Sequence, residues 1–427
     1  MSSKSDKKKS LVPRLRFPEF REAGAWEVKR LGELFALSSG NTPPRRDASL
    51  WTGAFPWISA SSMYDIRINQ ADHHISEEAA NNGAAIAEPG TILILVRGSM
   101  LFKRIPVGIA TRRVAFNQDV KALAIKSKKE NIEFFLHYLI GLEPYLLRKV
   151  LPTGIGAGKI ETSDLTDLTL GVPSSEEQQK IADCLSSLDD LIRAQGERIE
   201  ALKQHKKGLM QQLFPAEGET TPRLRFPEFR EAGAWEVQTI DQLASKIAQG
   251  GTPKTSIPKY WNGDIPWITP AEMGEDAAHH YAETTLRTIS REGFENSSTE
   301  LLPVNSVIIS SRAPIGYVTI NKIEMATNQG CKGIVPKKNT YHEFFYFSLI
   351  VAKQRLNDLG AGAGFKEIST STLKAFQISI PKYIEQQKIA HCLSSLDEVI
   401  GLESHKLDAL KNLKKGLMQQ LFPQEVA

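Results

Sequence analysis

Two stretches of the chain carry apolar side chains at alternating spacings of four and three residues. Eight of the ten positions in each series are apolar over about five heptads, which indicates a coiled coil rather than a helix packed on one domain. The apolar seam positions are Ile181, Leu185, Leu188, Ile192, Ile199, Leu202, Leu209 and Leu213 in the first stretch, and Ile389, Leu393, Leu396, Ile400, Leu407, Leu410, Leu417 and Leu421 in the second.

Polar residues interrupt both seams at matching places. Gln195 and Lys206 stand in the first seam where Glu403 and Lys414 stand in the second. Neither helix can hide its seam alone, so we expect the two to pair, although part of a seam could face a partner protein. We predict an antiparallel coiled coil, because this pairing puts one globular domain at each end and relates the two halves by pseudo-twofold symmetry.

Short aliphatic runs bounded by glycine and proline precede each helix and are typical of β-strands. In the first half these runs are residues 91–96, 107–110, 120–125 and 168–172. Leu31, Leu34 and Phe35 have helical spacing. Residues 131–150 are predicted to form a helix that Pro144 could kink. The fold class is therefore α+β, with mixed globular domains joined by long helices.

The chain consists of two copies of one unit. Residues 13–28 recur without substitution as residues 222–237, while most of the sequence that follows each copy has diverged. The two globular domains are therefore predicted to share a fold but not a surface. The predicted segments are a disordered basic tail at 1–12, a domain at 13–173, a helix at 174–215, a second domain at 216–381 and a helix at 382–423.

Composition adds few constraints. The 427 residues carry a formal net charge of +4, which permits a polyanion partner without requiring one. Three cysteines without paired spacing argue against a disulfide framework. The basic N-terminus lacks an apolar signal region, and the aliphatic run 92–96 is too short to cross a membrane. We expect a cytoplasmic protein without a membrane partner.

Basic residues lie among loop-forming residues in both diverged segments, where arginine and lysine could neutralise phosphates or read guanine. The candidate DNA contacts are Arg45, Arg46, Arg97, Lys103, Arg104, Arg112, Arg113, Lys254, Lys259, Arg312, Lys322 and Lys332. Each could instead be a solvated surface charge. Arg97 and Arg312 are favoured because both follow a β-run at matching positions. Trp57 and Trp267, in Pro-Trp-Ile, are predicted to be core residues.

Three segments imitate catalytic motifs. Residues 154–159 resemble a phosphate loop but lack its first glycine and its final serine or threonine, so a turn between strands or a backbone approach to DNA is predicted. Glu19, Glu27 and Lys29 suggest a nuclease site, but the second copy has Gln238 in place of Lys29. The histidine pairs 73–74 and 279–280 lack ligands at metal-binding spacing. No catalytic residue or metal ligand is predicted.

The order of these segments resembles the specificity subunit of type I restriction–modification systems. The resemblance covers nearly the whole chain and rests on the EQQKIA motifs 177–182 and 385–390 and the LRFPEF motifs 15–20 and 224–229. It implies two target-recognition domains, each reading half of a split site in double-stranded DNA. It also implies helices that set the spacing of the half-sites.

The same resemblance implies partners that carry the chemistry. Two modification subunits would dock on the helices and methylate adenine with S-adenosylmethionine, and restriction subunits would use ATP and Mg²⁺. This chain would be non-catalytic and hold no cofactor. The residues alone leave open a self-contained DNA-modifying enzyme or a coiled-coil adaptor that binds only proteins. Diverged domains beside nearly unchanged helices favour the DNA reader, because two half-sites differ while docking surfaces stay the same.

Overall fold

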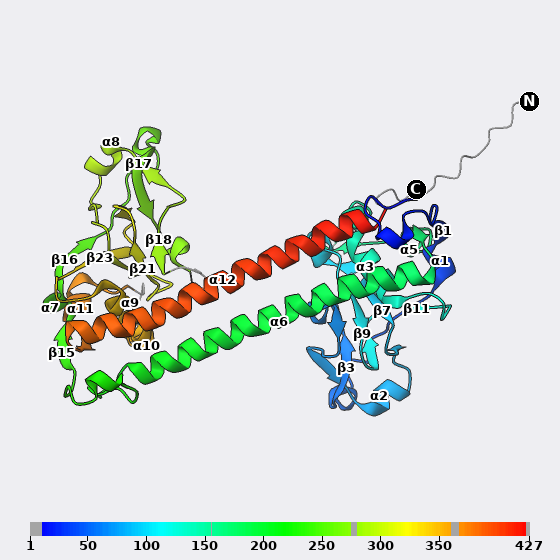
Figure 1. Cartoon of the computed structure of the whole chain (residues 1–427), viewed down its shortest axis with the longest axis horizontal. Coiled ribbons are helices and arrows are strands. Elements are labelled where there is room, and N and C mark those ends of the chain that lie inside the picture. The colour runs from blue at the N-terminus through cyan, green and yellow to red at the C-terminus, as the bar shows by residue number, and fades with distance from the viewer. Residues whose placement is uncertain (1–10, 155, 275–279, 360–366, 424–427) are drawn as a thin grey trace, which may run out of the picture. The chain divides into compact units, whose positions relative to one another are not determined.

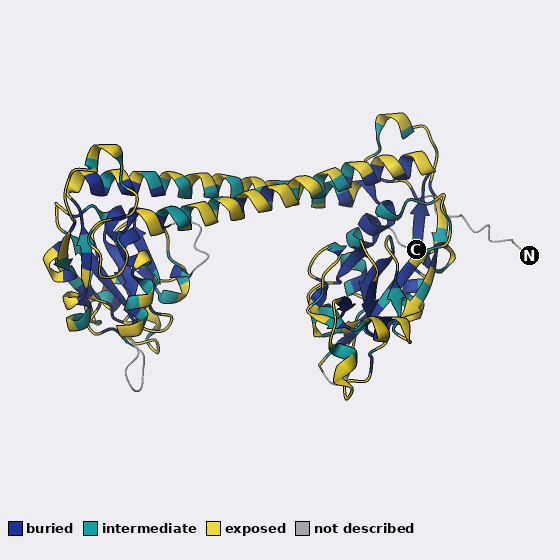
Figure 2. Cartoon of the chain, turned by 90° about the horizontal axis from the view of Figure 1, so that it is seen from below, coloured by how far each residue is buried: buried dark blue, intermediate teal, exposed yellow. Residues whose placement is uncertain are grey.

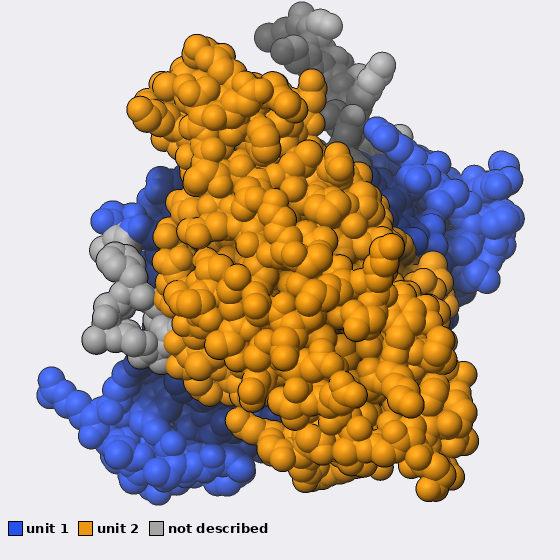
Figure 3. Space-filling model, turned by 90° about the vertical axis from the view of Figure 1, so that its left-hand side faces the viewer, with its two compact units in different colours: residues 1–194, 407–427 blue, residues 195–406 orange. Residues whose placement is uncertain are grey.

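The computed structural model describes residues 11–154, 156–274, 280–359 and 367–423, and the chain divides into two compact units. Unit 1 comprises residues 1–194 and 407–427, and unit 2 comprises residues 195–406 (Figure 3). Each unit holds one globular domain and a part of each long helix. These helices are α6 (Ser175–Leu213) and α12 (Tyr383–Leu421) (Figure 1).

The largest sheet of unit 1 has five strands and underlies the main core. Its order is β2 (Phe35–Ser39), β11 (Val120–Ile125), β7 (Ile92–Leu95), β9 (Val107–Ala110) and β4 (Arg67–Ile68). All pairs are antiparallel except β9 with β4. The predicted strands at 107–110 and 120–125 have the observed bounds, and the predicted strand at 91–96 contains β7. These three predictions are confirmed.

Smaller sheets complete unit 1. One contains β5 (His73–Ile75), β3 (Phe55–Ile58), β10 (Val114–Phe116) and β6 (Ile86–Ala87), beside helix α2 (Glu77–Asn81). A second pairs β1 (Glu27–Arg30) with β14 (Thr169–Val172), and a third contains β12 (Leu151–Pro152), β13 (Gly158–Lys159) and β8 (Arg97–Gly98). Within unit 1, β3 and α2 lie at the end remote from α6 (Figure 1).

Two predicted helices of unit 1 differ from the structure. The predicted helix at 131–150 is broken into α3 (Ile132–Gly141) and α4 (Glu143–Leu147), because Pro144 can stand only in the first turn of a new helix. The predicted helix near Leu31 is the single turn α1 (Leu31–Leu34), and Phe35 begins β2 instead. Unit 1 also contains α5 (Thr162–Thr166).

Unit 2 repeats the five-stranded sheet of unit 1. Its five-stranded sheet has the order β16 (Ala244–Gln249), β23 (Cys331–Pro336), β20 (Val307–Ser310), β21 (Val318–Asn321) and β18 (Tyr281–Ala282). Its smaller sheets contain β19 (Thr288–Ile289), β17 (Trp261–Ile268) and β22 (Ala326–Thr327), and the pair β15 (Glu236–Thr239) with β24 (Gln377–Ile380). Its short helices are α7 (Ile240–Leu243), α8 (Arg291–Glu295), α9 (His342–Val351), α10 (Lys353–Leu359) and α11 (Thr370–Ala375). The shared strand order confirms the predicted common fold.

An aromatic cluster joins a helix end to each globular domain. In unit 1, Phe422 at the end of α12 lies 5.4 Å from Phe134, whose ring is 5.8 Å from that of Trp26. In unit 2, Phe214 follows α6 and lies 5.3 Å from Phe344 and 6.0 Å from Trp235. Each globular domain therefore buries a phenylalanine from the end of a long helix. Unit 1 buries Phe422, which follows α12, and unit 2 buries Phe214, which follows α6.

The repeated opening segments lie against these helix ends. Leu15 donates its backbone N–H to the carbonyl of Gln420 at 2.9 Å, and Leu224 does the same to Gln212 at 2.9 Å. The first copy of the opening segment therefore meets the end of α12, and the second copy meets the end of α6. Leu11 is buried and pairs with Trp26, so the predicted disordered tail is wrong at that residue. The rest of the tail up to residue 10 lies outside the described residues.

The EQQ motifs fasten the start of each long helix. The Glu177 carboxylate accepts two hydrogen bonds from Arg16, at 2.7 and 2.6 Å, and Glu385 accepts two from Arg225 at 2.7 Å. Gln178 donates to the carbonyl of Pro173 at 3.0 Å and accepts from the N–H of Asn131 at 2.9 Å. These bonds tie the helix to the opening segment and to α3, which explains why the motif occurs in both copies.

The two long helices pair antiparallel within each unit. In unit 2, Gln195 of α6 donates to the carbonyl of Glu403 at 3.0 Å, and Lys206 donates to Asp397 at 2.6 Å. Partner numbers fall along α12 as they rise along α6, which is the antiparallel direction. All predicted seam residues are buried or half-buried, and Figure 2 shows the buried residues in dark blue. The predicted pairing is confirmed.

The charged seam contacts repeat with the helices exchanged. Lys206 of α6 binds Asp397 of α12 in unit 2, while Lys414 of α12 binds Asp189 of α6 in unit 1. Lys206 and Lys414 are equivalent positions of the repeat, as are Asp189 and Asp397. This exchange is what the predicted pseudo-twofold symmetry requires of the contacts.

Replacing Lys414 with Met should reduce the free energy of unfolding by about 3 kcal/mol, because it leaves the Asp189 carboxylate largely buried without its cation. The side chains of Lys414 and Asp189 are only 12% and 15% exposed. The double variant Lys414→Met with Asp189→Leu should recover most of the loss. Urea denaturation measures both, and Lys415→Met, at an exposed site, is the matched control. Equal stabilities of Lys414→Met and the control would contradict the assignment.

His137 should make stability depend on pH. Its ring is fully buried, and burial, followed by the positive charges of Lys414 and Arg67, lowers its pKa to about 3. The lowered pKa favours the folded state above pH 6.5, and this stability is lost as pH falls from 6.5 towards 3. Phe347 occupies the equivalent position in unit 2, so His137→Phe should fold. It should flatten the pH dependence of unfolding below pH 6.5, by up to about 1.4 kcal/mol per pH unit. An unchanged slope in urea titrations would refute this.

Candidate nucleic-acid interface

Each unit contains an equivalent loop that begins with a glycine, Gly40 in unit 1 and Gly250 in unit 2. A Cβ on Gly40 would lie 2.1 Å from the carbonyl oxygen of Asn117, and one on Gly250 would lie 1.8 Å from that of Asn328, so neither position accepts a side chain. Thr42 then donates to the Gln118 side chain at 2.6 Å. The residues shared by the two diverged segments therefore hold this loop against the sheet.

Each loop receives a pair of perpendicular tryptophans. Trp57 donates its indole N–H to the carbonyl of Asn41 at 3.2 Å, and Trp267 donates to Gly251 at 2.9 Å. Both indoles are 2% exposed, so their prediction as core residues is confirmed. A second, half-buried tryptophan lies edge-on to each: Trp51 at 5.0 Å from Trp57, and Trp261 at 5.2 Å from Trp267.

The structure exposes all but one of the predicted DNA contacts. The exposed residues are Arg45, Arg46, Arg97, Lys103, Arg104, Arg112, Arg113, Lys254, Lys259, Arg312 and Lys322. Arg97 belongs to the short strand β8, and Arg104 donates to the carbonyl of Met63 at 3.1 Å. Exposure makes these side chains available to a polyanion, but it does not distinguish a DNA contact from a solvated charge.

Three of the predicted DNA-contacting residues form ion pairs with carboxylates within the protein. Arg113 pairs with Glu88 at 3.2 Å, Arg312 pairs with Glu367 at 3.0 Å, and Lys259 pairs with Glu292. A paired carboxylate cancels much of the charge that a phosphate would meet. The preference for Arg312 as a DNA contact is therefore weakened.

Lys332 differs from the other candidates because its side chain lies inside the domain. It is 1% exposed on β23, and burial, opposed by Glu367 and reinforced by Arg312, lowers the pKa of its ammonium group. As a surface contact this prediction is wrong, because both faces of β23 are covered here: Cys331 and Ile334 are buried as well as Lys332. Lys322 by contrast is exposed, with its ammonium nitrogen 3.6 Å from the ring centre of Tyr281.

Arg287 was missed by the sequence analysis. Its guanidinium carbon lies 3.8 Å from the ring centre of Trp261 and 5.3 Å from that of Trp267. In unit 1 a different arginine, Arg45, lies 5.9 Å from the ring centre of Trp51. The two arginines occupy unrelated places in the repeat, so only the fold reveals that both reach the outer tryptophan.

The segments that imitate catalytic motifs have structural roles. Strand β12 pairs antiparallel with β13, so the prediction of a turn between strands is confirmed, although residue 155 lies outside the described residues. Glu19 pairs with Lys180 of α6 at 3.1 Å, whereas Lys29 pairs with Glu27 at 3.1 Å and Glu130 at 3.4 Å. The suspected nuclease carboxylates therefore have separate partners.

The described residues also limit the choice of site. Within the described ranges, no group of three or more histidine, cysteine, aspartate or glutamate side chains could hold a metal ion. His280 is buried beside Asp397, and His279 lies outside the described residues. None of the described helices is both long and apolar enough to cross a membrane.

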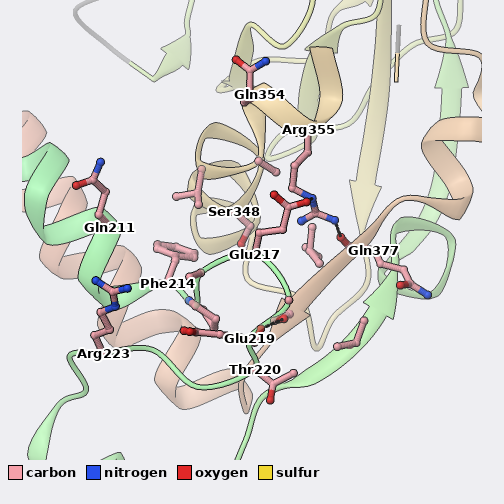
Figure 4. Close-up of a pocket in the computed structure, with 18 of the residues that line it drawn as sticks. Gln211, Phe214, Glu217, Glu219, Thr220, Arg223, Ser348, Gln354, Arg355 and Gln377 are labelled. Carbon is pink, nitrogen blue, oxygen red and sulfur yellow. Dashed lines mark hydrogen bonds and ion pairs between the residues drawn. The ribbon is translucent and has the colours of Figure 1, made fainter. Parts of the chain in front are cut away.

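Unit 2 contains a cavity of about 760 Å³ beside the end of α6 (Figure 4). Phe214, Ser348 and Ile378 line its apolar part, and Glu217 and Arg355 lie at its rim. The guanidinium of Arg355 donates to the carbonyl of Gln377 at 3.1 Å and lies 3.6 Å from the Glu217 carboxylate. Glu217 and Arg355 therefore neutralise each other.

One difference between the repeats contributes to this cavity. Ser348 on α9 is equivalent to Tyr138 on α3, where the tyrosine ring stacks on Phe422 at 4.6 Å and its hydroxyl accepts from the N–H of Gly171 at 3.3 Å. Ser348 instead donates to the carbonyl of Phe344 at 2.9 Å. The space that a tyrosine fills in unit 1 is left to the cavity in unit 2.

The family model described as the type I restriction modification DNA specificity domain matches residues 24–204 and again residues 233–412. The chain belongs to the type I restriction–modification specificity family. With two copies of the specificity domain, it is a DNA sequence-specificity subunit with two recognition domains. The sequence-based resemblance is therefore confirmed.

Two relatives come from Methanocaldococcus jannaschii. The type I restriction enzyme MjaIX specificity subunit is 36% identical over 190 residues, which is 44% of this chain and 44% of that protein. The putative type I restriction enzyme MjaX specificity subunit is 27% identical over 93% of this chain and 92% of its own length. A crystal structure of the S subunit from M. genitalium has a TM-score of 0.59 at 16% identity, covering 97% of this chain and 100% of that one. At that identity it supports the shared fold.

Replacing Tyr138 with Ser should lower the free energy of unfolding by about 3 kcal/mol, because it removes a fully packed ring and opens a cavity like that of unit 2. Ser348→Ala is the matched control and should cost no more than about 1 kcal/mol, the value of its one hydrogen bond to Phe344. Urea denaturation of the full chain compares the two variants. Similar losses would show that the repeats do not differ in packing here.

Proposed function

We propose that this specificity subunit reads a bipartite site in double-stranded DNA, with one recognition domain on each half-site. The observation that supports this proposal is that the two units have the same fold but different exposed basic residues. The two units share strand order, helix contacts and a tryptophan pair, yet their exposed basic residues lie at mostly different positions. Two readers on one scaffold need this combination, because half-sites differ in sequence while their spacing must remain constant.

We further propose that the helices set the half-site spacing and dock two modification subunits. The repeat supports two such surfaces, since the helix contacts of one unit recur in the other with α6 and α12 exchanged. Adenine methylation with S-adenosylmethionine would belong to those subunits. ATP and Mg²⁺ would serve the restriction subunits. The complex would act on cellular DNA in the cytoplasm.

The proposed division of labour makes this chain non-catalytic. Its carboxylates at the suspected nuclease site pair with lysines in two separate places, which supports a structural role for them. A protein-only adaptor would not need two diverged domains, each with an exposed set of basic side chains. The DNA reader therefore accounts for more of the molecule than either alternative.

The test is single-molecule methylation mapping of DNA from cells that express this chain together with its modification subunit. A split methylated motif should appear with both proteins and be absent when either is omitted. A double variant, Glu27→Ala with Lys29→Ala, is the matched control and should leave the motif unchanged, whereas a self-contained enzyme at this site would lose it.

Three results would overturn the proposal. Methylation by the purified chain without partners would make it an enzyme. A stable complex without any methylated motif, and without salt-dependent DNA binding by the same complex, would favour the protein adaptor. A single continuous motif would contradict the assignment of one half-site to each domain.

A further inference from the structure

We infer that the tryptophan pair of each unit is a platform that presents one arginine to the edge of a guanine in DNA: Arg45 in unit 1 and Arg287 in unit 2. This inference rests on the proposed function and assigns one specificity-determining residue to each half-site. The platform is defined as Trp51 with Trp57 in unit 1 and Trp261 with Trp267 in unit 2.

In unit 2 both the side chain and the backbone of Arg287 make fixed contacts. The guanidinium carbon lies 3.8 Å from the ring centre of Trp261, within the range of a cation–π contact. The backbone carbonyl of Arg287 accepts from the N–H of Trp267 at 3.1 Å and from the Thr285 hydroxyl at 2.7 Å. Side chain and backbone are therefore both fixed to the platform, although the residue is exposed.

In unit 1 the arginine comes from a different segment, the loop that precedes Trp51. The Trp51 indole donates to the carbonyl of Pro44 at 3.3 Å, which ties the loop that carries Arg45 to the ring. His73 lies on β5 opposite Trp57. The equivalent position in unit 2, just before β19, is that of Arg287. A cavity of about 190 Å³, lined by Arg45, Trp51 and His73, leaves the indole open beside the guanidinium.

The chemistry of a guanidinium beside an aromatic ring suits base reading, and Arg287 at 3.8 Å lies nearer to its ring than Arg45 at 5.9 Å. Stacking uses the face of the planar group and leaves its N–H donors pointing outward in the plane, where two can bind O6 and N7 of guanine. An arginine that is already oriented loses less conformational entropy on binding than a free one. Arg113 and Arg312, by comparison, direct their donors to carboxylates.

Two oxygens of a DNA phosphate could accept the same pair of hydrogen bonds as O6 and N7 of guanine. The experiment must therefore distinguish a phosphate from a base. Base reading requires a fixed direction, while a phosphate can be met by any mobile cation near the backbone. Arg46, the neighbour of Arg45, and Lys254, whose carbonyl accepts from the Trp261 indole, are exposed and provide such cations. The fixed guanidinium is for this reason assigned to guanine.

The test is selection from a randomised double-stranded DNA library by the full chain purified with its modification subunits. Arg45→Ala should relax a single guanine position in one half-site, by about 10- to 100-fold, and leave the other half-site unchanged. Arg287→Ala should do the same in the other half-site. Lysine at either position should behave like alanine, because it lacks the planar fork. Arg46→Ala is the neighbouring control and should keep the selected sequence.

The outcomes separate this inference from the proposed function. If the variants bind all sequences more weakly, with a salt dependence reduced by about one ion, the arginines contact phosphates and the guanine assignment fails. If the selected site is unchanged in the variants, the platform is not a reader, while the proposed function stands. If the wild-type complex selects no sequence, the proposed function fails and the inference fails with it. Thermal unfolding of each variant should match the wild type, since both side chains are exposed.

Discussion

The structure depends on the burial of two helical seams that neither helix can cover alone. Pairing α6 with α12 removes both seams from water, and it also brings the end of each helix to the globular domain of the other repeat. There Phe422 and Phe214 complete aromatic clusters around Trp26 and Trp235. A domain without its crossing helix would lose a core residue, so the coiled coil is part of each domain and not a linker between finished ones.

Charged groups on the helices determine which pairing is allowed. Apolar seams of this kind could slide by a heptad with little loss of buried area, but sliding would separate Lys206 from Asp397 and Lys414 from Asp189. Buried ion pairs add little net stability, because desolvation offsets their attraction, yet an unpaired one is costly. The pairs therefore specify direction and register, in the way that a polar seam residue specifies a coiled-coil partner.

The same scaffold tolerates divergence where function needs it. Ser348 replaces Tyr138 and Phe347 replaces His137 without a change in strand order, because the aromatic cluster around each helix end remains. At the opposite end of each domain, the tryptophan pair is kept while the cation above it comes from a different segment. Packing and recognition are thus carried by different residues, which lets a half-site change without rebuilding the protein.

The sequence by itself determined the repeat, the helical seams, several strands and the family, because these follow from local periodicity and from motifs that occur twice. It predicted the antiparallel pairing, whose direction the contacts of the folded chain then established. Tertiary structure decided the rest. It broke the helix at Pro144, placed Lys332 inside a sheet and paired Arg312 with Glu367. It also brought Arg45 and Arg287 to equivalent tryptophans from unrelated positions. Whether a cation is buried, neutralised or presented depends on contacts between segments distant along the chain, and no local pattern records these contacts.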